Sequence, residues 1–353
     1  MVMKIYSKKL VPVILTALLM LCSVNANAGN EQRSGQAGAT ELLINPWARS
    51  SGWGGINTAS VQGLEATFMN VAGLAGTVNT ELVFSSTSWL FDMQVNAFGF
   101  SKALADDAVL GLAITSIGFG DINITTTEAP EGTGTTYAPT MMNIGLSYAK
   151  KFTDNISGGA TVRMISESTP DMKASAISLD AGIQYVAGSD RQIKFGVSLK
   201  NVGPKMKYEG DGNGVRLTNT EAHGAEYSQS FEFKSDAFEL PSSLNIGGAY
   251  DFTIDQDNRI TVAGNFTSNS FTKDQYGLGF EYAYQSYFML RSGYVYEDGI
   301  VENETRTTAF TGFNAGFTFE VPLSAGTNFG LDFSYRQSSP LDSPVSIGAR
   351  ITL

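Results

Sequence analysis

A catalytic site that uses histidine would have to contain His223, because it is the only histidine in the sequence. Glu226 and Ser228 follow it closely enough to suggest the carboxylate and the nucleophile of a hydrolase triad. Such a triad works only when the three side chains are held in contact with one another, whereas these three lie in a polar loop predicted at 202–242. We therefore interpret His223 as a solvated loop residue, and we expect neither a catalytic site nor an enzyme.

Metal binding has one candidate segment, residues 209–214, with the sequence Glu-Gly-Asp-Gly-Asn-Gly. Oxygen donors stand there at alternate positions before a glycine, as they do in calcium loops. The bidentate glutamate of such a loop would fall on Thr220, while Glu221 comes one residue late, and no helices flank the segment. A zinc site would need several His or Cys ligands. An ordinary flexible loop is the favoured interpretation, calcium is the alternative, and no cofactor is expected.

Arg49 begins the glycine-rich run 49–55, Arg-Ser-Ser-Gly-Trp-Gly-Gly. We expect this run inside the protein, where a buried guanidinium needs carboxylate or carbonyl partners because an unpaired buried charge is expensive. Such a pair would pin the run to the structure around it. A Rossmann phosphate loop is the motif alternative, but no strand precedes the run and no βαβ pattern follows it.

The elements that position these residues begin after the first 28 residues, which predict a cleavable signal peptide. A basic region with three lysines precedes the apolar run 10–24, and Ala26-Asn27-Ala28 forms a small-x-small cleavage site. Cys22 could instead belong to a lipobox, but the bulky Leu21 stands where a small residue is expected. Because Cys22 is the only cysteine and leaves with the peptide, the mature chain has no disulfide.

The charge and hydropathy of the mature chain exclude two classes of protein. Without the signal peptide, 20 basic residues face 34 acidic ones, a net charge of −14, which argues against a nucleic-acid partner. Beyond the signal peptide there is no apolar stretch of about 18 residues or more, so no helix is expected to span a membrane. If the chain crosses a membrane, it must cross as strands.

Strand periodicity dominates most of the chain. Apolar side chains recur at every second position in 193–200, 277–284 and 331–336, with glycine, serine or charged residues between them. One face of each predicted strand is therefore apolar, and the other is small, polar or charged.

Strand length and loop rhythm favour a membrane barrel over a soluble sandwich. We predict about fourteen antiparallel strands, many of roughly ten residues or more, which suits a tilted membrane span. Short turns alternate with long polar loops at 123–136, 202–242 and 298–308, and long loops of this kind lie outside the cell. The predicted strands are 80–90, 92–101, 108–122, 137–152, 156–168, 174–187, 192–201, 243–253, 258–268, 275–285, 286–297, 309–321, 327–336 and 344–353. The sequence thus predicts an all-β, antiparallel transmembrane β-barrel at 80–353, integral to the cell outer membrane and surrounded by its lipid.

Charged residues on the small face are expected to point into the lumen, because a charge on the lipid face costs about 2–4 kcal/mol at mid-depth. They either line a channel or satisfy one another in a filled interior, and a filled interior is favoured. These residues are Arg163, Lys194, Lys200, Asp332, Arg336 and Arg350.

Residues 29–79 do not alternate, and they contain a short predicted helix before Val71. The segment is too long for a strand connection and too small for a domain. We expect it to fold into or under the barrel as a plug, where its glycines permit tight backbone packing.

Two runs in this segment, 42–55 and 70–75, resemble the opening of the PorV/PorQ family of type IX secretion outer-membrane proteins, which is itself similar to the FadL fatty-acid transporters. The chain departs from the family pattern at Met69 and Val71, where Trp and Pro are expected. The resemblance implies a fourteen-strand barrel and a plug motif with a structural or gating role. The motif residues kept here are Arg49, Gly52, Gly54, Gly55, Asn70, Ala72, Gly73, Leu74 and Ala75.

The resemblance implies a role in protein export, as a barrel that receives or anchors cargo after the type IX translocon. The partners would then be a translocon subunit and secreted cargo. The predicted partner surface is the 202–242 loop with its aromatic residues Tyr208, Tyr227, Phe231, Phe233 and Phe238. One alternative is a FadL-like channel for hydrophobic small molecules, gated by residues 42–75. A structural barrel without transport is another.

Overall fold

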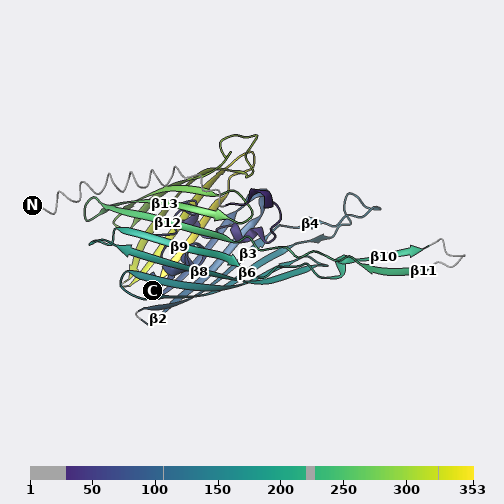
Figure 1. Cartoon of the computed structure of the whole chain (residues 1–353), viewed down its shortest axis with the longest axis horizontal. Coiled ribbons are helices and arrows are strands. Elements are labelled where there is room, and N and C mark those ends of the chain that lie inside the picture. Colours follow the sequence, from purple (N-terminus) through teal and green to yellow (C-terminus); the bar gives the residue numbers. More distant parts are fainter. Residues whose placement is uncertain (1–28, 106, 220–226, 325) are drawn as a thin grey trace, which may run out of the picture.

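The computed structural model describes residues 29–105, 107–219, 227–324 and 326–353 (Figure 1). The predicted signal peptide and His223, Glu226, Thr220 and Glu221 lie outside the described residues.

Fourteen antiparallel strands form a closed barrel (Figure 1), which confirms the predicted fold class. Each barrel strand pairs with the next one along the chain, and β1 closes the ring on β18 in the register Glu81↔Thr352 to Ser88↔Val345. The barrel strands are β1 (Thr80–Ser88), β2 (Gln94–Ala105), β3 (Ala108–Gly118), β6 (Thr140–Lys151), β7 (Ile156–Ser168), β8 (Lys173–Ala187), β9 (Ile193–Val202), β12 (Ser243–Thr253), β13 (Asn258–Asn269), β14 (Gln275–Tyr284), β15 (Phe288–Glu297), β16 (Phe310–Ser324), β17 (Thr327–Ser338) and β18 (Val345–Thr352).

Short turns join the strands at one end of the barrel, and longer connections lie at the other. The turn between β14 and β15 shows why one predicted boundary was wrong. Gln285 and Ser286 both have a positive φ, 49° and 61°, and the Tyr287 N–H donates to the Tyr284 carbonyl. Residues 285–287 form the turn, and Tyr284 pairs with Phe288 across it, so β15 begins at Phe288 instead of at residue 286.

Two long connections contain short strands that the sequence analysis placed wholly or partly in loops. β4 (Ile122–Asn123) pairs with β5 (Thr136–Tyr137). β10 (Gly214–Asn219) pairs with β11 (Tyr227–Glu232), and this hairpin projects well beyond the barrel in Figure 1. Both hairpins are held by backbone hydrogen bonds between their strands. Because neither face of such a hairpin is buried, its sequence carries little of the apolar alternation that predicts a strand.

The outer face of the barrel is apolar and the inner face is small or charged. On β9, Phe195 and Val197 are 53% and 45% exposed, whereas Ser198 and Lys200, which point inward, are 2% and 6% exposed. Exposed apolar side chains that alternate with buried polar ones are typical of a barrel in lipid. None of the helices in the described residues is long and apolar enough to cross a membrane.

Residues 29–79, which we name the closing segment, begin at the long-loop end of the barrel, where Arg33 pairs with Glu239, and then run inside the ring of strands (Figure 1). The segment contains short helices only: η1 (Glu31–Arg33), η2 (Thr40–Leu43), α2 (Ala48–Ser51), α3 (Ala66–Met69) and η3 (Val71–Gly76). The short helix predicted before Val71 is α3. A further short helix, η4 (Leu90–Asp92), connects β1 to β2.

Glycines in the inner wall make room for the closing segment. A Cβ added to Gly99 on β2 would lie 2.3 Å from Leu64 Cδ2, and one added to Gly293 on β15 would lie 2.2 Å from the Trp53 carbonyl oxygen. Both distances are shorter than atomic contact allows, so only glycine permits the backbones to approach this closely.

Candidate functional site

The candidate site is the interface between the closing segment and the inner wall. Much of it is an apolar cluster in which the segment packs against β1, β2, β3 and β6. From the segment the cluster takes Trp47, Val61, Leu64, Ala66, Met69, Leu74 and Ala75, and from the wall Val83, Ala97, Val109 and Ala149. Because these side chains are almost completely removed from solvent, they close the lumen along this side of the barrel.

Wall side chains hold the backbone of the closing segment where it has no regular structure. Gln184 on β8 donates from Nε2 to the carbonyls of Thr58 and Val61, at 3.1 and 3.0 Å. Ser198 on β9 donates to the Met69 carbonyl at 2.9 Å. Buried carbonyls need donors, and the wall supplies them here in place of helix or sheet.

Glu81 on β1 also holds the backbone of the closing segment, but as a hydrogen-bond acceptor. Its carboxylate accepts a hydrogen bond from the Leu64 N–H at 2.7 Å, and it lies 3.9 Å from Arg350 on β18. Glu81, Gln184 and Ser198 were not predicted as site residues. Their only signal in the sequence is that each stands at an inward position of its strand.

Asn70 of the plug motif joins the closing segment to the wall directly. Its Nδ2 donates to the carbonyls of Thr58 and Ile183, at 3.0 and 3.1 Å, and its Oδ1 accepts from the Ala72 N–H. A Cβ on Gly182 would lie 2.0 Å from Asn70 Oδ1, so the wall strand is shaped around this side chain.

The other motif glycines lie at tight positions of the same interface. Gly54 and Gly55 have φ values of 70° and 76°, which favour glycine. A Cβ on Gly52 would lie 3.0 Å from Gly316 Cα, and one on Gly73 would lie 2.1 Å from the Val61 carbonyl oxygen. Ala72, also predicted, is fully buried.

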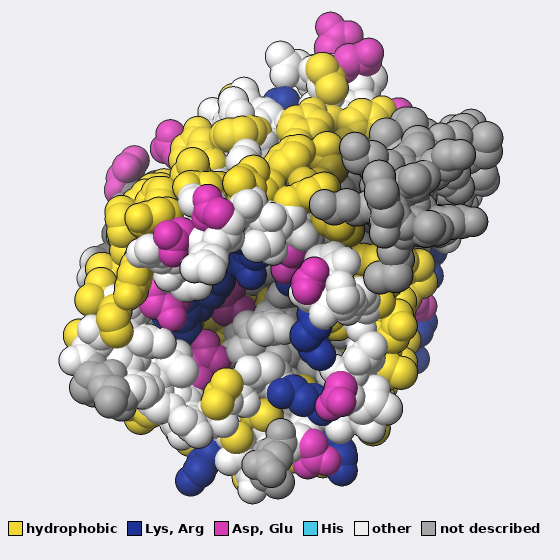
Figure 2. Space-filling view, turned by 90° about the vertical axis from the view of Figure 1, so that its left-hand side faces the viewer, with side chains coloured by type: hydrophobic (Ala, Val, Ile, Leu, Met, Phe, Trp, Pro, Cys, Tyr) yellow, Lys and Arg dark blue, Asp and Glu magenta, His cyan; other side chains and the backbone are white. Residues whose placement is uncertain are grey.

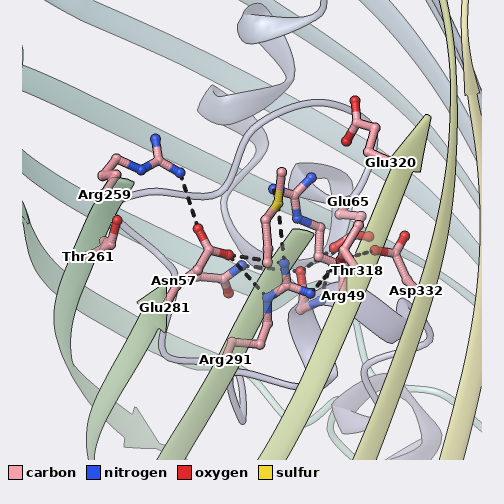
Figure 3. Close-up of polar contacts among 12 residues, drawn as sticks. Arg49, Asn57, Glu65, Arg259, Thr261, Glu281, Arg291, Thr318, Glu320 and Asp332 are labelled. Atoms are coloured by element: carbon pink, nitrogen blue, oxygen red, sulfur yellow. Dashed lines mark hydrogen bonds and ion pairs between the residues drawn. The ribbon is translucent and has the colours of Figure 1, made fainter. Parts of the chain in front are cut away.

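The structure differs from the expectation for Arg49 (Figure 3). Its Nη2 lies 3.3 Å from Met289 Sδ, and no ion pair within 4 Å joins it to any carboxylate among the described residues. The reason is that nearby carboxylates are already engaged. Glu65 accepts from the N–H and the hydroxyl of Ser50, and Glu281 pairs with Arg291 at 3.0 Å.

Glu65 shows that Arg49 still acts through its charge. Burial and the charge of Asp332 raise the pKa of Glu65 and the charges of Arg49 and Arg350 lower it, so that the pKa is about 7. Arg49 therefore favours the ionised form of a buried carboxyl group without contacting it.

The charged residues predicted to face the lumen do so, and most have partners there. Arg163 pairs with Asp180 at 2.7 Å, Lys194 with Asp251 at 2.6 Å, and Arg350 with Glu320 at 2.9 Å. Lys200 lies 3.7 Å from the centre of the Phe68 ring, and Arg336 lies 3.5 Å from that of Phe310. Asp332 accepts a hydrogen bond from the Thr318 hydroxyl. These pairs fit a filled interior better than an open channel.

Two cavities remain beside the closing segment. One of about 30 Å³ lies among Leu42, Trp47 and Phe68 of the segment and Ala113 and Arg163 of the wall. A volume of this size holds about one or two water molecules, so this part of the lumen is closed to larger molecules.

The second cavity, of about 230 Å³, is lined mainly by polar groups, including Arg49, Glu65, Lys194, Arg259 and Glu281. Lys194 and Arg259 each lie one residue inside the turn-side end of their strand. Figure 2 looks onto that end and shows a hollow with charged side chains gathered in it.

The predicted aromatic partner residues fall into two groups. Tyr208 donates to the Glu167 carboxylate and packs on Phe238 with ring centroids 5.7 Å apart, so both belong to the mouth of the barrel. Phe231 and Phe233, on and beside β11, are 50% and 65% exposed on the projecting hairpin. Tyr227 is the first residue of β11.

The candidate calcium loop forms η5 (Asp211–Asn213), which leads into β10. No group of three or more His, Cys, Asp or Glu residues that could hold a metal ion occurs in the part of the chain that the structure describes.

Solved structures of similar fold are found for this protein, but no sequence family or curated protein matches it. The P. putida toluene transporter TodX has a TM-score of 0.57 at 14% identity, covering 88% of this chain and 98% of that one. The monoaromatic hydrocarbon channel CymD has a TM-score of 0.54 at 15% identity, covering 88% of this chain and 97% of that one.

At these identities the likeness shows the fold. Together with the apolar outer face, it identifies the protein as an integral β-barrel of the outer membrane. The fourteen-strand barrel implied by the sequence resemblance is confirmed, whereas membership of the PorV/PorQ family is not supported. The proteins of similar fold named above are a channel and a transporter, not enzymes.

Proposed function

We propose that this barrel is a passage for small hydrophobic molecules across the outer membrane, with the closing segment as its gate. The observation that carries the proposal is the apolar cluster between that segment and the β1–β3 and β6 wall. Separating these two surfaces exposes apolar groups on both sides, and a hydrophobic molecule can cover them better than water can. Proteins of the same fold are named as carriers of toluene and of monoaromatic hydrocarbons.

Passage requires the closing segment to move, because the cavity of about 30 Å³ beside Trp47 and Phe68 is too small for a hydrocarbon. The hydrogen bonds that hold the segment are individually weak. A bond such as that from Ser198 to Met69 contributes only about 0.5–1.5 kcal/mol, so the segment can move by breaking a few of them.

Cargo reception in type IX secretion is the second candidate function. One feature favours it: Phe231 and Phe233 lie exposed on the projecting hairpin, where a protein partner could bind them. We rank it below the channel because the closing segment and its apolar cluster have no evident use in cargo reception.

A disulfide lock tests the channel. A Cβ on Gly348 would lie 3.2 Å from the Cβ of Ala48, close to the spacing of about 3.5–4.5 Å found in disulfides. The only natural cysteine is Cys22, in the predicted signal peptide, so Ala48→Cys with Gly348→Cys gives a single pair that joins α2 to β18. Uptake of the fluorescent hydrophobic probe N-phenyl-1-naphthylamine by intact cells measures transport.

We expect the wild-type protein to speed uptake over cells without it, the oxidised double variant to lose that gain, and reduction to restore it. Each single-cysteine variant is the matched control and should transport normally. Equal uptake with and without the wild-type protein, or full uptake by the oxidised lock, would contradict the proposal. Recovery of secreted cargo on the barrel, with no effect on uptake, would favour the export role.

A further inference from the structure

The long-loop end of the barrel clamps the start of the closing segment. Ala37 forms a parallel bridge with Glu239, and the Gly38 N–H donates to the Glu239 carbonyl at 3.1 Å. The two stems of the 203–242 connection are themselves joined, because Met206 and Phe238 exchange backbone hydrogen bonds. Helix η2 is therefore held between β7, β8 and these stems.

Two carboxyl groups meet under this clamp. Glu41 on η2 and Glu167 on β7 are only 6% and 3% exposed. Leu42, which follows Glu41, packs in the same buried apolar cluster as Ile165, two residues before Glu167, and the charge of Glu167 raises the pKa of Glu41, so the two carboxyl groups lie close together. Glu167 also accepts from the Tyr208 hydroxyl through Oε2. The Oε1 atom of each glutamate is buried and has no donor. Buried polar atoms without partners are rare and costly.

The surroundings supply no positive charge to this pair. Apolar side chains enclose it, among them Leu42 on η2 and Ile165 on β7. No ion pair within 4 Å joins either glutamate to a basic residue of the described chain. One buried cation, Arg163, lines the same small cavity as Glu41 but is paired with Asp180 at 2.7 Å. The other charged groups on the packed elements lie on the more exposed rim: Glu31, Arg33, Lys173, Lys205, Lys207, Glu209 and Glu239.

We propose that a protonated Glu41 donates a hydrogen bond to Glu167 and so forms a proton-dependent latch that fastens the mouth end of the closing segment to the wall. One proton between the two carboxyl groups satisfies both buried oxygens. When it is lost, two adjacent carboxylates in an apolar site repel each other. A role of this latch in controlling uptake rests on the proposed channel function. Docking of the closing segment onto the wall can be measured without any transport assay.

The direction of the pH dependence follows from Glu41. Burial, together with the charge of Glu167, raises the pKa of Glu41 from 4.5 to about 7. The docked segment holds the proton more tightly than the released one, so docking weakens as pH rises from about 4.5 to about 7 and then stays constant. With a pKa of 4.5 for released Glu41 and about 7 for docked Glu41, the equilibrium constant for docking should fall about 30-fold between pH 5.5 and pH 8.

Amide hydrogen exchange of the full protein in detergent tests the latch. The readout is the protection factor of peptides covering residues 37–44, because protection factors remove the intrinsic pH dependence of exchange. We expect the native protein to lose about 30-fold of its protection between pH 5.5 and pH 8. Glu41→Gln should keep its protection at both pH values, since an amide donates to Glu167 without titrating. Glu167→Gln should keep a pH dependence in the same direction but weaker than that of the native protein, because it removes the charge of Glu167 and leaves Glu41 buried.

Glu239→Gln is the matched control, because it removes the exposed ion pair with Arg33 and leaves the buried pair intact. It should retain the native pH dependence. Equal protection of the native protein at the two pH values, or a native pH dependence in both Glu41→Gln and Glu167→Gln, would overturn the latch. Uptake is not a readout here, so a failure of transport would count against the channel alone.

Discussion

Replacing Gln184 should loosen the middle of the closing segment while leaving the barrel closed. Gln184 is 5% exposed, and its Nε2 bonds the Thr58 and Val61 carbonyls. Gln184→Met keeps the size and shape of the side chain but removes the donor. The Thr58 carbonyl keeps its bond from Asn70 at 3.0 Å, so the main loss falls on the Val61 carbonyl, which is left without this donor.

The expected cost follows from that difference. Leaving one buried acceptor unpaired costs about 1–3 kcal/mol, so we take about 2 kcal/mol for local release of the segment. At about 1.4 kcal/mol per tenfold change, amide exchange in residues 58–64 should speed up about 30-fold.

Hydrogen exchange followed by mass spectrometry, in detergent at one pH, measures this change. Peptides from β14 and β15 act as an internal reference and should be unaffected. Gln275→Met is the matched control, because Gln275 donates to Glu297 at the rim, at 2.9 Å, and holds no backbone of the closing segment. Unchanged exchange in residues 58–64 of Gln184→Met would refute the idea that wall side chains hold this segment.

Three further predictions concern other parts of the interface and the topology. Gly99→Leu should displace the closing segment and raise its protease sensitivity, whereas Gly118→Leu, with no atom within 4 Å of its added Cβ, should not. Arg49→Ala should destabilise the segment in the same assay by about 1 kcal/mol or less, well below the about 3–5 kcal/mol of a broken buried ion pair, and a larger loss would reveal a missed partner. Cysteine at Asn213 should react with an impermeant maleimide on whole cells, and cysteine at Asp154 should not. The reverse pattern would invert the topology.

Much of the barrel could be predicted because its signal is local. Inward and outward positions alternate along each strand, so parity alone placed Arg163 and Lys200 in the lumen, and both are buried there. The N-terminal segment was recognised because alternation is absent from it. Inward glycines such as Gly99 and Gly293 are a further signal that the sequence analysis did not use, since glycine in a strand often marks a place where another backbone approaches closely.

Partners within the site could not be predicted because they depend on register and depth between distant parts of the chain. Arg291 pairs with Glu281 because β14 and β15 place them opposite each other. Once Glu281 is engaged, Arg49 is left beside Met289. Glu41 and Glu167 are 126 positions apart in the sequence numbering, and nothing in their local sequence indicates that they meet. Non-local pairings of this kind have no periodic signature.

The barrel and the closing segment are held by separate sets of bonds, and this separation makes a gate physically reasonable. The strand ladder closes on itself through β1 and β18, without any residue of 29–79. The segment is attached instead by side chains such as Gln184 and Glu81 and by apolar packing. Releasing it therefore costs the free energy of that interface but breaks no barrel ladder. A hydrophobic ligand that covers the exposed apolar surfaces binds the released state better, and so shifts the equilibrium towards opening.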